Sequence, residues 1–107
     1  MANPKKLQQK RCANMLKALA DPERLLIVKQ LRGGPKNVSE LAALLKVELF
    51  SVSHHLGVLR QAGLVLDEKQ GRFVVYCLNP RIFHPTDEPN TGDLLDFGCC
   101  RLEFPAS

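Results

Sequence analysis

The sequence predicts an α+β fold in which about four helices precede a two-stranded hairpin. Apolar residues recur at helical spacing through much of residues 5–61, and the apolar period changes to two over residues 64–78. The length of 107 residues suits one domain with a tail. These three observations together indicate a small helical body closed by a hairpin.

The first two helices are expected over residues 5–20 and from Pro22 to about residue 32. Leu7, Cys12, Leu16 and Leu19 fall near one face of the first helix, and lysines and arginines cover the rest. Such a basic surface either contacts phosphates or is a solvated face. Asp21 can cap the second helix, and Pro22 stands where a missing N–H costs nothing.

Residues 37–63 form the part of the chain around which the prediction is organised. Asn37 and Glu40 have the spacing of a capping box at the start of a third helix. Residues 46–48 are expected to turn into a fourth helix over about residues 49–61. Its apolar stripe comprises Val52, Leu56 and Leu59. The opposite face carries Ser51, His54, Gly57 and Gln61, flanked by Ser53 and Arg60. Small and hydrogen-bonding groups of this kind can lie against base edges and phosphates in a DNA major groove.

Two β-rich runs follow, over residues 64–68 and 72–78, and they flank the tripeptide Lys69-Gln70-Gly71. With Arg72 beside it, the tip of this hairpin is basic. Next to a helix-turn-helix such a hairpin is a wing, and its tip can reach a neighbouring groove or phosphate backbone. A hairpin that only closes the core is compatible with the same pattern.

Charge divides the chain into a basic body, residues 1–82, and an acidic tail, residues 83–107. The body holds 14 Lys and Arg against 6 Asp and Glu, whereas the tail holds one Arg and five acids. A basic body suits a polyanion such as DNA, although an evenly spread surplus would mean little. Within the tail, residues 84–93 are expected to be irregular, and residues 99–104 alternate as a short strand does. That strand could add to a sheet edge in its own subunit or in a partner.

The chain has no apolar run near 18 residues and no apolar segment behind its charged start, so we expect no membrane span and a cytoplasmic location. The four cysteines would then be thiols rather than a disulfide framework.

The stretches ALADPERLLIVKQL (18–31), VSELAALLKVELFSVSHHLGVLRQAGLV (38–65) and GRFVVYCL (71–78) resemble the arsenic-repressor (ArsR/SmtB) family of bacterial winged helix-turn-helix regulators. The resemblance implies a homodimer that binds double-stranded operator DNA with an inverted repeat and represses until an effector loosens it. It implies recognition-helix contacts from Ser51, Ser53 and His54, and phosphate contacts from Arg60, Lys69, Gln70 and Arg72. His55 stands nearer the core stripe, so it is either a DNA contact or a structural histidine.

Three features depart from the family pattern. Many metal-sensing members have a Cys-x-Cys pair where this chain has Asn37-Val38-Ser39. Members usually end in a helix that packs on the first helix across the dimer, whereas the tail here is rich in proline and has only His84 as a histidine. Leu49 and Phe50 replace polar residues at the start of the recognition helix, where they could pack inward, meet a thymine methyl or contact another subunit.

Cys99-Cys100 is the most suggestive chemical feature of the tail. With Cys12 these thiols could bind trivalent arsenic or antimony, or one of them could be oxidised with Cys12 or with its neighbour. A third interpretation is that these cysteines are small hydrophobic residues buried in the core. Neighbouring residues of a strand point to opposite faces, which weakens binding of one ion by both Cys99 and Cys100. We interpret Cys77 as structural, and the sequence assigns no definite cofactor.

We therefore predict a sequence-specific DNA-binding regulator, in the form of a dimeric repressor. The alternative is a winged-helix module that binds a protein and has lost DNA binding, a reading that the acidic tail and Leu49/Phe50 favour. An enzyme such as a thiol reductase is disfavoured, because no histidine or carboxylate is spaced to activate a nucleophile, and no catalytic residue is predicted.

Overall fold

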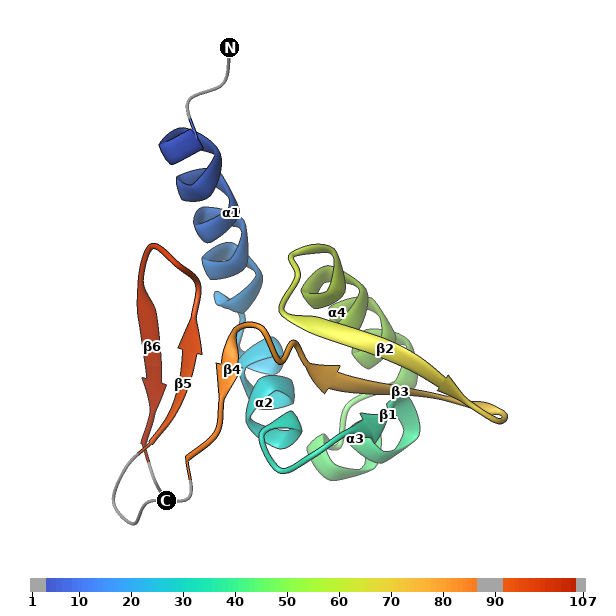
Figure 1. Cartoon of the computed structure of the whole chain (residues 1–107). Helices are drawn as coiled ribbons and strands as arrows, with labels where there is room; N and C mark the ends of the chain where they lie inside the picture. The colour runs from blue at the N-terminus through green and yellow to red at the C-terminus, as the bar shows by residue number, and fades with distance from the viewer. Residues whose placement is uncertain (1–3, 87–91, 106–107) are drawn as a thin grey trace.

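The computed structural model describes residues 4–86 and 92–105, and in this part four helices and two small sheets share one core. The helices are α1 (Pro4–Leu19), α2 (Pro22–Leu31), α3 (Val38–Leu45) and α4 (Leu49–Gln61). The strands are β1 (Lys36–Asn37), β2 (Val65–Gln70), β3 (Phe73–Leu78), β4 (Phe83–His84), β5 (Asp93–Asp96) and β6 (Arg101–Phe104). The β2–β3 hairpin and the β5–β6 hairpin lie at opposite ends of the molecule (Figure 1).

Two side-chain caps start the helices where the sequence predicts them. The Asp21 carboxylate accepts the backbone N–H of Arg24, and this hydrogen bond is the main reason that the pKa of Asp21 is lowered. Asn37 and Glu40 form the reciprocal capping box of α3 at 2.8 and 3.0 Å. The predicted start points of α2 and α3 are therefore confirmed.

The first sheet has the strand order β1-β3-β2 and is antiparallel. The predicted hairpin is confirmed, but its first strand reaches further toward the tip than expected, to Gln70, and its second strand begins one residue later than expected, at Phe73. Only Gly71 and Arg72 are left for the turn, and Gly71 has a φ of 62°, which glycine adopts without strain. The prediction missed β1, which ties the start of α3 to β3.

The second sheet has the order β4-β5-β6 and occupies the acidic tail. The short strand expected within residues 99–104 is confirmed as β6. The interpretation of residues 84–93 as irregular is wrong at both ends, because His84 belongs to β4 and Asp93 to β5. Residues 87–91 lie outside the described part of the chain. Within the described residues, these strands stand where the resemblance would imply a C-terminal helix.

The core joins both sheets to the helices. Ile27, Leu41 and Leu56 are fully buried in it, and Leu95 and Phe104 reach it from the second sheet. Arg32 fastens that sheet to α2 through a 2.9 Å ion pair with Asp93, and its guanidinium lies over the Phe104 ring. The tail strands are therefore packed on the body.

Among the described helices, none is long and apolar enough to cross a membrane by itself. The pair α3 and α4 reaches the required length and apolar composition together, but the two are bent by 115° relative to each other.

Candidate nucleic-acid interface

Helices α3 and α4 form the helix-turn-helix that the sequence predicts. The turn between them contains Lys46 in a left-handed conformation with φ 56°, and its backbone N–H is donated to the Ala42 carbonyl. This left-handed residue ends α3 and allows the chain to turn sharply into α4. The 115° bend between the axes leaves one side of α4 free of α3.

Helix α4 is held in place by its apolar stripe. Val52, Leu56 and Leu59 are fully buried, and burial of each such side chain stabilises the fold by about 1.5–3 kcal/mol. A helix pinned along one face must present the opposite face in a fixed orientation. The apolar stripe predicted for this helix is confirmed.

The opposite face of α4 is open to solvent. Ser53 and His54 are exposed, and Ser51 and Gly57 are half-buried. A Cβ added to Gly57 would meet nothing within 4 Å, so packing does not require glycine at this position. The structure thus places four of the predicted contact residues along one accessible face.

Leu49 and Phe50 begin α4 and project from it. Their exposed fractions are 55% and 83%, which excludes inward packing as the reason for apolar residues at these positions. Both remaining interpretations, contact with a thymine methyl or with another subunit, involve a partner outside the chain. The helix start also has no side-chain cap, because Glu48 makes no capping hydrogen bond.

His55 differs sharply from its neighbour His54. Its side chain is only 14% exposed and bridges two residues of α2, with Nδ1 3.1 Å from the Arg24 guanidinium and Nε2 3.1 Å from the Glu23 carboxylate. Because a guanidinium only donates, Nδ1 accepts and the N–H on Nε2 donates to Glu23. Of the two roles predicted for His55, these contacts favour the structural one.

Arg60 joins the end of α4 to the wing. Its guanidinium donates to the Asp67 carboxylate of β2 at 3.2 Å, and both side chains are largely exposed. An exposed ion pair of this kind is worth at most about 1 kcal/mol, so Arg60 remains able to turn toward a phosphate. The sequence did not predict this ion pair between Arg60 and Asp67.

The wing tip carries Lys69, Gln70 and Arg72, all of them exposed. Phe73, which pairs with Gln70 at the tip, is exposed as well. The wing extends away from the helices in Figure 1, so its basic tip is free to contact a partner that also touches α4.

Cys12, Cys99 and Cys100 belong to α1 and the β5–β6 turn rather than to this face, and their redox state corrects the prediction. Cys12 of α1 and Cys99 of the β5–β6 turn form a disulfide, with their Cα atoms 6.3 Å apart, so the expectation of four thiols is wrong. The alternative that one of the tail thiols is oxidised with Cys12 is the one that the structure shows, between residues 87 positions apart in the chain.

Cys100 remains a thiol, half-buried, with its Sγ 3.8 Å from that of Cys99. The structure therefore brings the three predicted effector residues together, but two of them are bonded to each other. In the described ranges, no group of three or more His, Cys, Asp or Glu is arranged to hold a metal ion. Cys77 is a half-buried thiol in β3.

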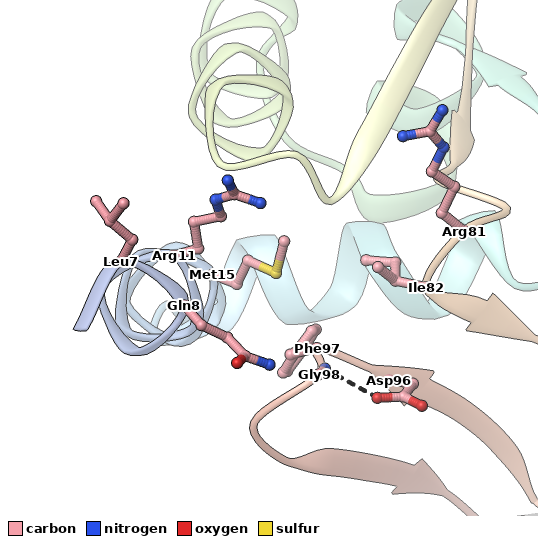
Figure 2. Close-up of a pocket in the computed structure, with 9 residues that line it drawn as sticks. All are labelled: Leu7, Gln8, Arg11, Met15, Arg81, Ile82, Asp96, Phe97 and Gly98. Atoms are coloured by element: carbon pink, nitrogen blue, oxygen red, sulfur yellow. Dashed lines mark hydrogen bonds between the residues drawn. The ribbon is translucent and has the colours of Figure 1, made fainter. Parts of the chain in front are cut away.

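A pocket of about 650 Å³ (Figure 2) has among its lining residues Arg11 and Gly98, the chain neighbours of the two disulfide cysteines. Arg11 and Met15 of α1 line it together with Arg81, and the backbone N–H of Gly98 donates to Asp96 at its edge. None of the predicted DNA contacts lines this pocket. The nucleic-acid face and the cysteine region are separate parts of the molecule.

Comparisons with known proteins agree with this geometry. Residues 21–66 match the model of a family described as bacterial regulatory protein, arsR family. The chain is similar to the HTH-type transcriptional regulator NmtR of Mycobacterium tuberculosis, with 50% identity over 62% of this chain and 55% of the relative. It is also similar to the transcriptional repressor SdpR of Bacillus subtilis, with 36% identity over 64% of this chain and 77% of that protein.

Among solved structures, the chain resembles Mb0332 from Mycobacterium bovis, with a TM-score of 0.70 and 27% identity over 76% of this chain and 75% of that one. That structure is described as a homodimeric winged helix-turn-helix DNA-binding domain and as a possible ArsR-family transcriptional regulator. For NmtR, the match spans about half of the relative's length.

Proposed function

Because this chain belongs to the arsR family of bacterial regulatory proteins and has its winged helix-turn-helix fold, we propose that it represses transcription as a homodimer on operator DNA. One observation carries the proposal. Helix α4 buries Val52, Leu56 and Leu59 and thereby presents Ser53 and His54 to solvent on the opposite face. A helix fixed in this way can enter a major groove without losing its packing.

In the proposed complex, the first two turns of α4 read the bases. The hydroxyls of Ser51 and Ser53 and the imidazole of His54 can donate to or accept from base edges. Phe50 offers an apolar surface to a thymine methyl. Gly57 leaves room for the helix backbone to approach the DNA closely, because no side chain stands there.

Positively charged and polar side chains around this helix position the protein on the phosphates. Lys69, Gln70 and Arg72 at the wing tip and Arg60 at the end of α4 are the proposed contacts. Such contacts set the register and orientation but do not read sequence. Residues 1–82 hold eight more positive than negative charges, which suits this partner.

The test of DNA recognition is enrichment of bound sequences from a random library of double-stranded DNA. We expect the full chain to enrich an inverted repeat with half-sites about one helical turn apart, as two symmetric recognition helices require. His54→Ala should flatten the enriched motif, and Gln9→Ala on the solvent side of α1 is the matched control. A library that stays random with folded protein would overturn the proposal.

We propose, further, that the effector acts on Cys12, Cys99 and Cys100. Reduction of the Cys12–Cys99 disulfide by a dithiol yields two thiols with two electrons and two protons taken from the reductant. Three neighbouring thiols can then displace three hydroxyls of arsenous acid, releasing three waters and forming three As–S bonds. The 3.8 Å between the sulfurs of Cys99 and Cys100 supports this grouping.

Operator release with arsenite, zinc and peroxide tests the effector proposal. The native chain, prereduced for arsenite and zinc, is compared with the Cys99→Ser/Cys100→Ser variant, and Cys77→Ser serves as the control. We expect arsenite to release operator DNA from the native chain and from the control, but not from the double variant. Release that is unchanged in the double variant would exclude these cysteines as the effector site.

The second candidate is a winged-helix module that binds a protein instead of DNA. The exposure of Leu49 and Phe50 at the start of α4 favours it. In that case Phe50→Ala would abolish binding to the protein partner, and no DNA sequence would be enriched.

If operator DNA is the partner, as proposed first, the role of the protein is regulatory rather than catalytic, and the protein acts in the cytoplasm.

A further inference from the structure

Strand β6 is an edge strand, because of the described residues only those of β5 pair with it. Its backbone orientation follows from its neighbour. The backbone N–H of Asp96 donates to the Ile82 carbonyl at 2.8 Å, so it points away from β6. Arg101 is opposite Asp96 in the ladder, and its own N–H and C=O therefore point away from β5, toward the open edge.

Alternation along the strand gives the orientation of the other residues. Glu103, two residues beyond Arg101, also directs its N–H and C=O to the open edge. Leu102 and Phe104 bond to β5 and turn their side chains toward the core. Arg101 and Glu103 place theirs on the exposed face. The free edge thus has an apolar inner side and an outer side with one positive and one negative charge.

We infer that β6 pairs antiparallel with β6 of a second copy of this chain, with Leu102 opposite Leu102 of that copy. In this register Arg101 lies opposite Glu103 of the second copy, and the two-fold axis repeats the pair. The outward amides and carbonyls of both residues then form four main-chain hydrogen bonds. The two Leu102 side chains meet on the inner side, where Cys100 lies opposite Phe104 of the second copy.

The neighbouring symmetric registers are unfavourable. Centring the pair on Arg101 sets two arginines against each other, and centring it on Glu103 sets two glutamates against each other. A slip by one residue sets the outward amides of one copy opposite residues whose amides face β5, and it mixes the two faces. The charges of this edge are therefore self-complementary in one register only, as an isologous interface requires.

Pairing of two four-residue strands buries too little surface for a stable dimer, so helix α1 must contribute. The disulfide ties Cys12 of α1 to Cys99, two residues before β6. Leu16 follows Cys12 by one helical turn and is exposed, which leaves apolar surface near the hairpin. Figure 1 shows β6 at the end of the molecule opposite the wing, so this pairing keeps the wings of both copies accessible.

The inference rests on the proposed homodimer and names its interface. Charged residues on an edge strand also serve to prevent pairing, and in that case the full chain would not associate through β6. An experiment can distinguish pairing through β6 from charges that prevent pairing. Because Arg101 and Glu103 carry opposite charges two residues apart, the proposed register predicts which charge-reversed chains will pair with each other.

Sedimentation equilibrium of the full chain tests the interface. Glu103→Arg and Arg101→Glu each replace two attractive pairs by two repulsive ones, and we expect each variant's dimer dissociation constant to rise at least about tenfold. A mixture of the two variants restores opposite charges at both positions. We expect the mixed dimer to form with a dissociation constant within about threefold of the native one.

Two further variants sharpen the test. Glu103→Pro removes an outward N–H without touching the bonds to β5, so it should weaken the dimer at unchanged circular dichroism. Glu68→Arg reverses an exposed charge on β2, the edge of the other sheet, and should have no effect. A native chain that stays monomeric, single variants that dimerise normally, or a mixture that fails to recover would each overturn the inference.

The outcomes separate this interface from the proposed function. A dimer that obeys the charge rule but enriches no DNA would contradict operator binding and leave the interface intact. A DNA-binding dimer that is indifferent to residues 101 and 103 would contradict the interface alone.

Discussion

The Nε2 atom of His55 lies 3.1 Å from the Glu23 carboxylate, so this histidine of α4 is fastened to α2. His54, the residue before it, is exposed to solvent. Two adjacent histidines therefore have different tasks, one in setting the position of α4 and one on its free face.

Loss of this bridge should weaken the fold. His55→Ala leaves the Arg24 and Glu23 side chains without their partner, and we expect the free energy of unfolding to fall by about 1–3 kcal/mol. Urea unfolding followed by circular dichroism measures the change. His54→Ala, as the control, should stay within about 0.5 kcal/mol of the native chain. Equal losses in both variants would contradict the assignment.

The free face of α4 and the wing tip should affect DNA binding in different ways. His54→Ala should cost about 1–3 kcal/mol on the operator and little on random DNA, since it removes a base contact. Lys69→Ala should weaken both DNAs alike and reduce the salt slope by about two for the dimer, because each subunit loses one phosphate contact. Fluorescence anisotropy with operator and random DNA distinguishes the two roles. If both variants lose affinity for the two DNAs in the same proportion, the assignment of a base contact to His54 and a phosphate contact to Lys69 is wrong.

Gly57 offers a test in which stability and binding move in opposite directions. Alanine is favoured over glycine within a helix by about 1 kcal/mol, and the site has open space for the extra methyl. Gly57→Ala should therefore raise the stability of the free protein. If the helix backbone approaches DNA here, the same variant should bind the operator at least about tenfold less tightly. Unchanged affinity would show that this position does not touch DNA.

The Cys12–Cys99 disulfide closes a long loop and should stabilise the fold. Its reduction by dithiothreitol should lower the free energy of unfolding by about 2–5 kcal/mol, because the unfolded chain gains freedom. Cys12→Ser should show the same loss without reductant, whereas Cys77→Ser should still respond to reductant. Stability that does not change on reduction would mean that the hairpin is held by packing and by the Arg32–Asp93 ion pair alone.

The helices and the wing were predictable because their signals are local. The caps at Asp21 and Asn37 and the stripe of Val52, Leu56 and Leu59 depend on residues within a turn or two of each other. Strand β1 escaped prediction because two residues carry no period, and it exists only through its pairing with β3.

Sequence reasoning also missed most of the second sheet. Strand β5 has two adjacent leucines between aspartates and therefore no alternation, although Leu95 is fully buried. The partners of His55 stand 31 and 32 residues away. The pairing of Cys12 with Cys99, 87 residues apart, was one of several alternatives for the cysteines, and the sequence did not decide between them. Contacts over such distances depend on the completed fold, so a single sequence shows the candidate residues but not their partners.

The salt dependence of operator binding tests the central claim most directly. If two α4 helices and two wings meet about 6–10 phosphates, the affinity should fall by about 10³–10⁵ between 50 and 200 mM salt, with a linear dependence of its logarithm on that of the salt concentration. Anisotropy titrations of the native chain on its enriched operator measure this slope. An affinity that stays flat over the same range would contradict DNA recognition by this face.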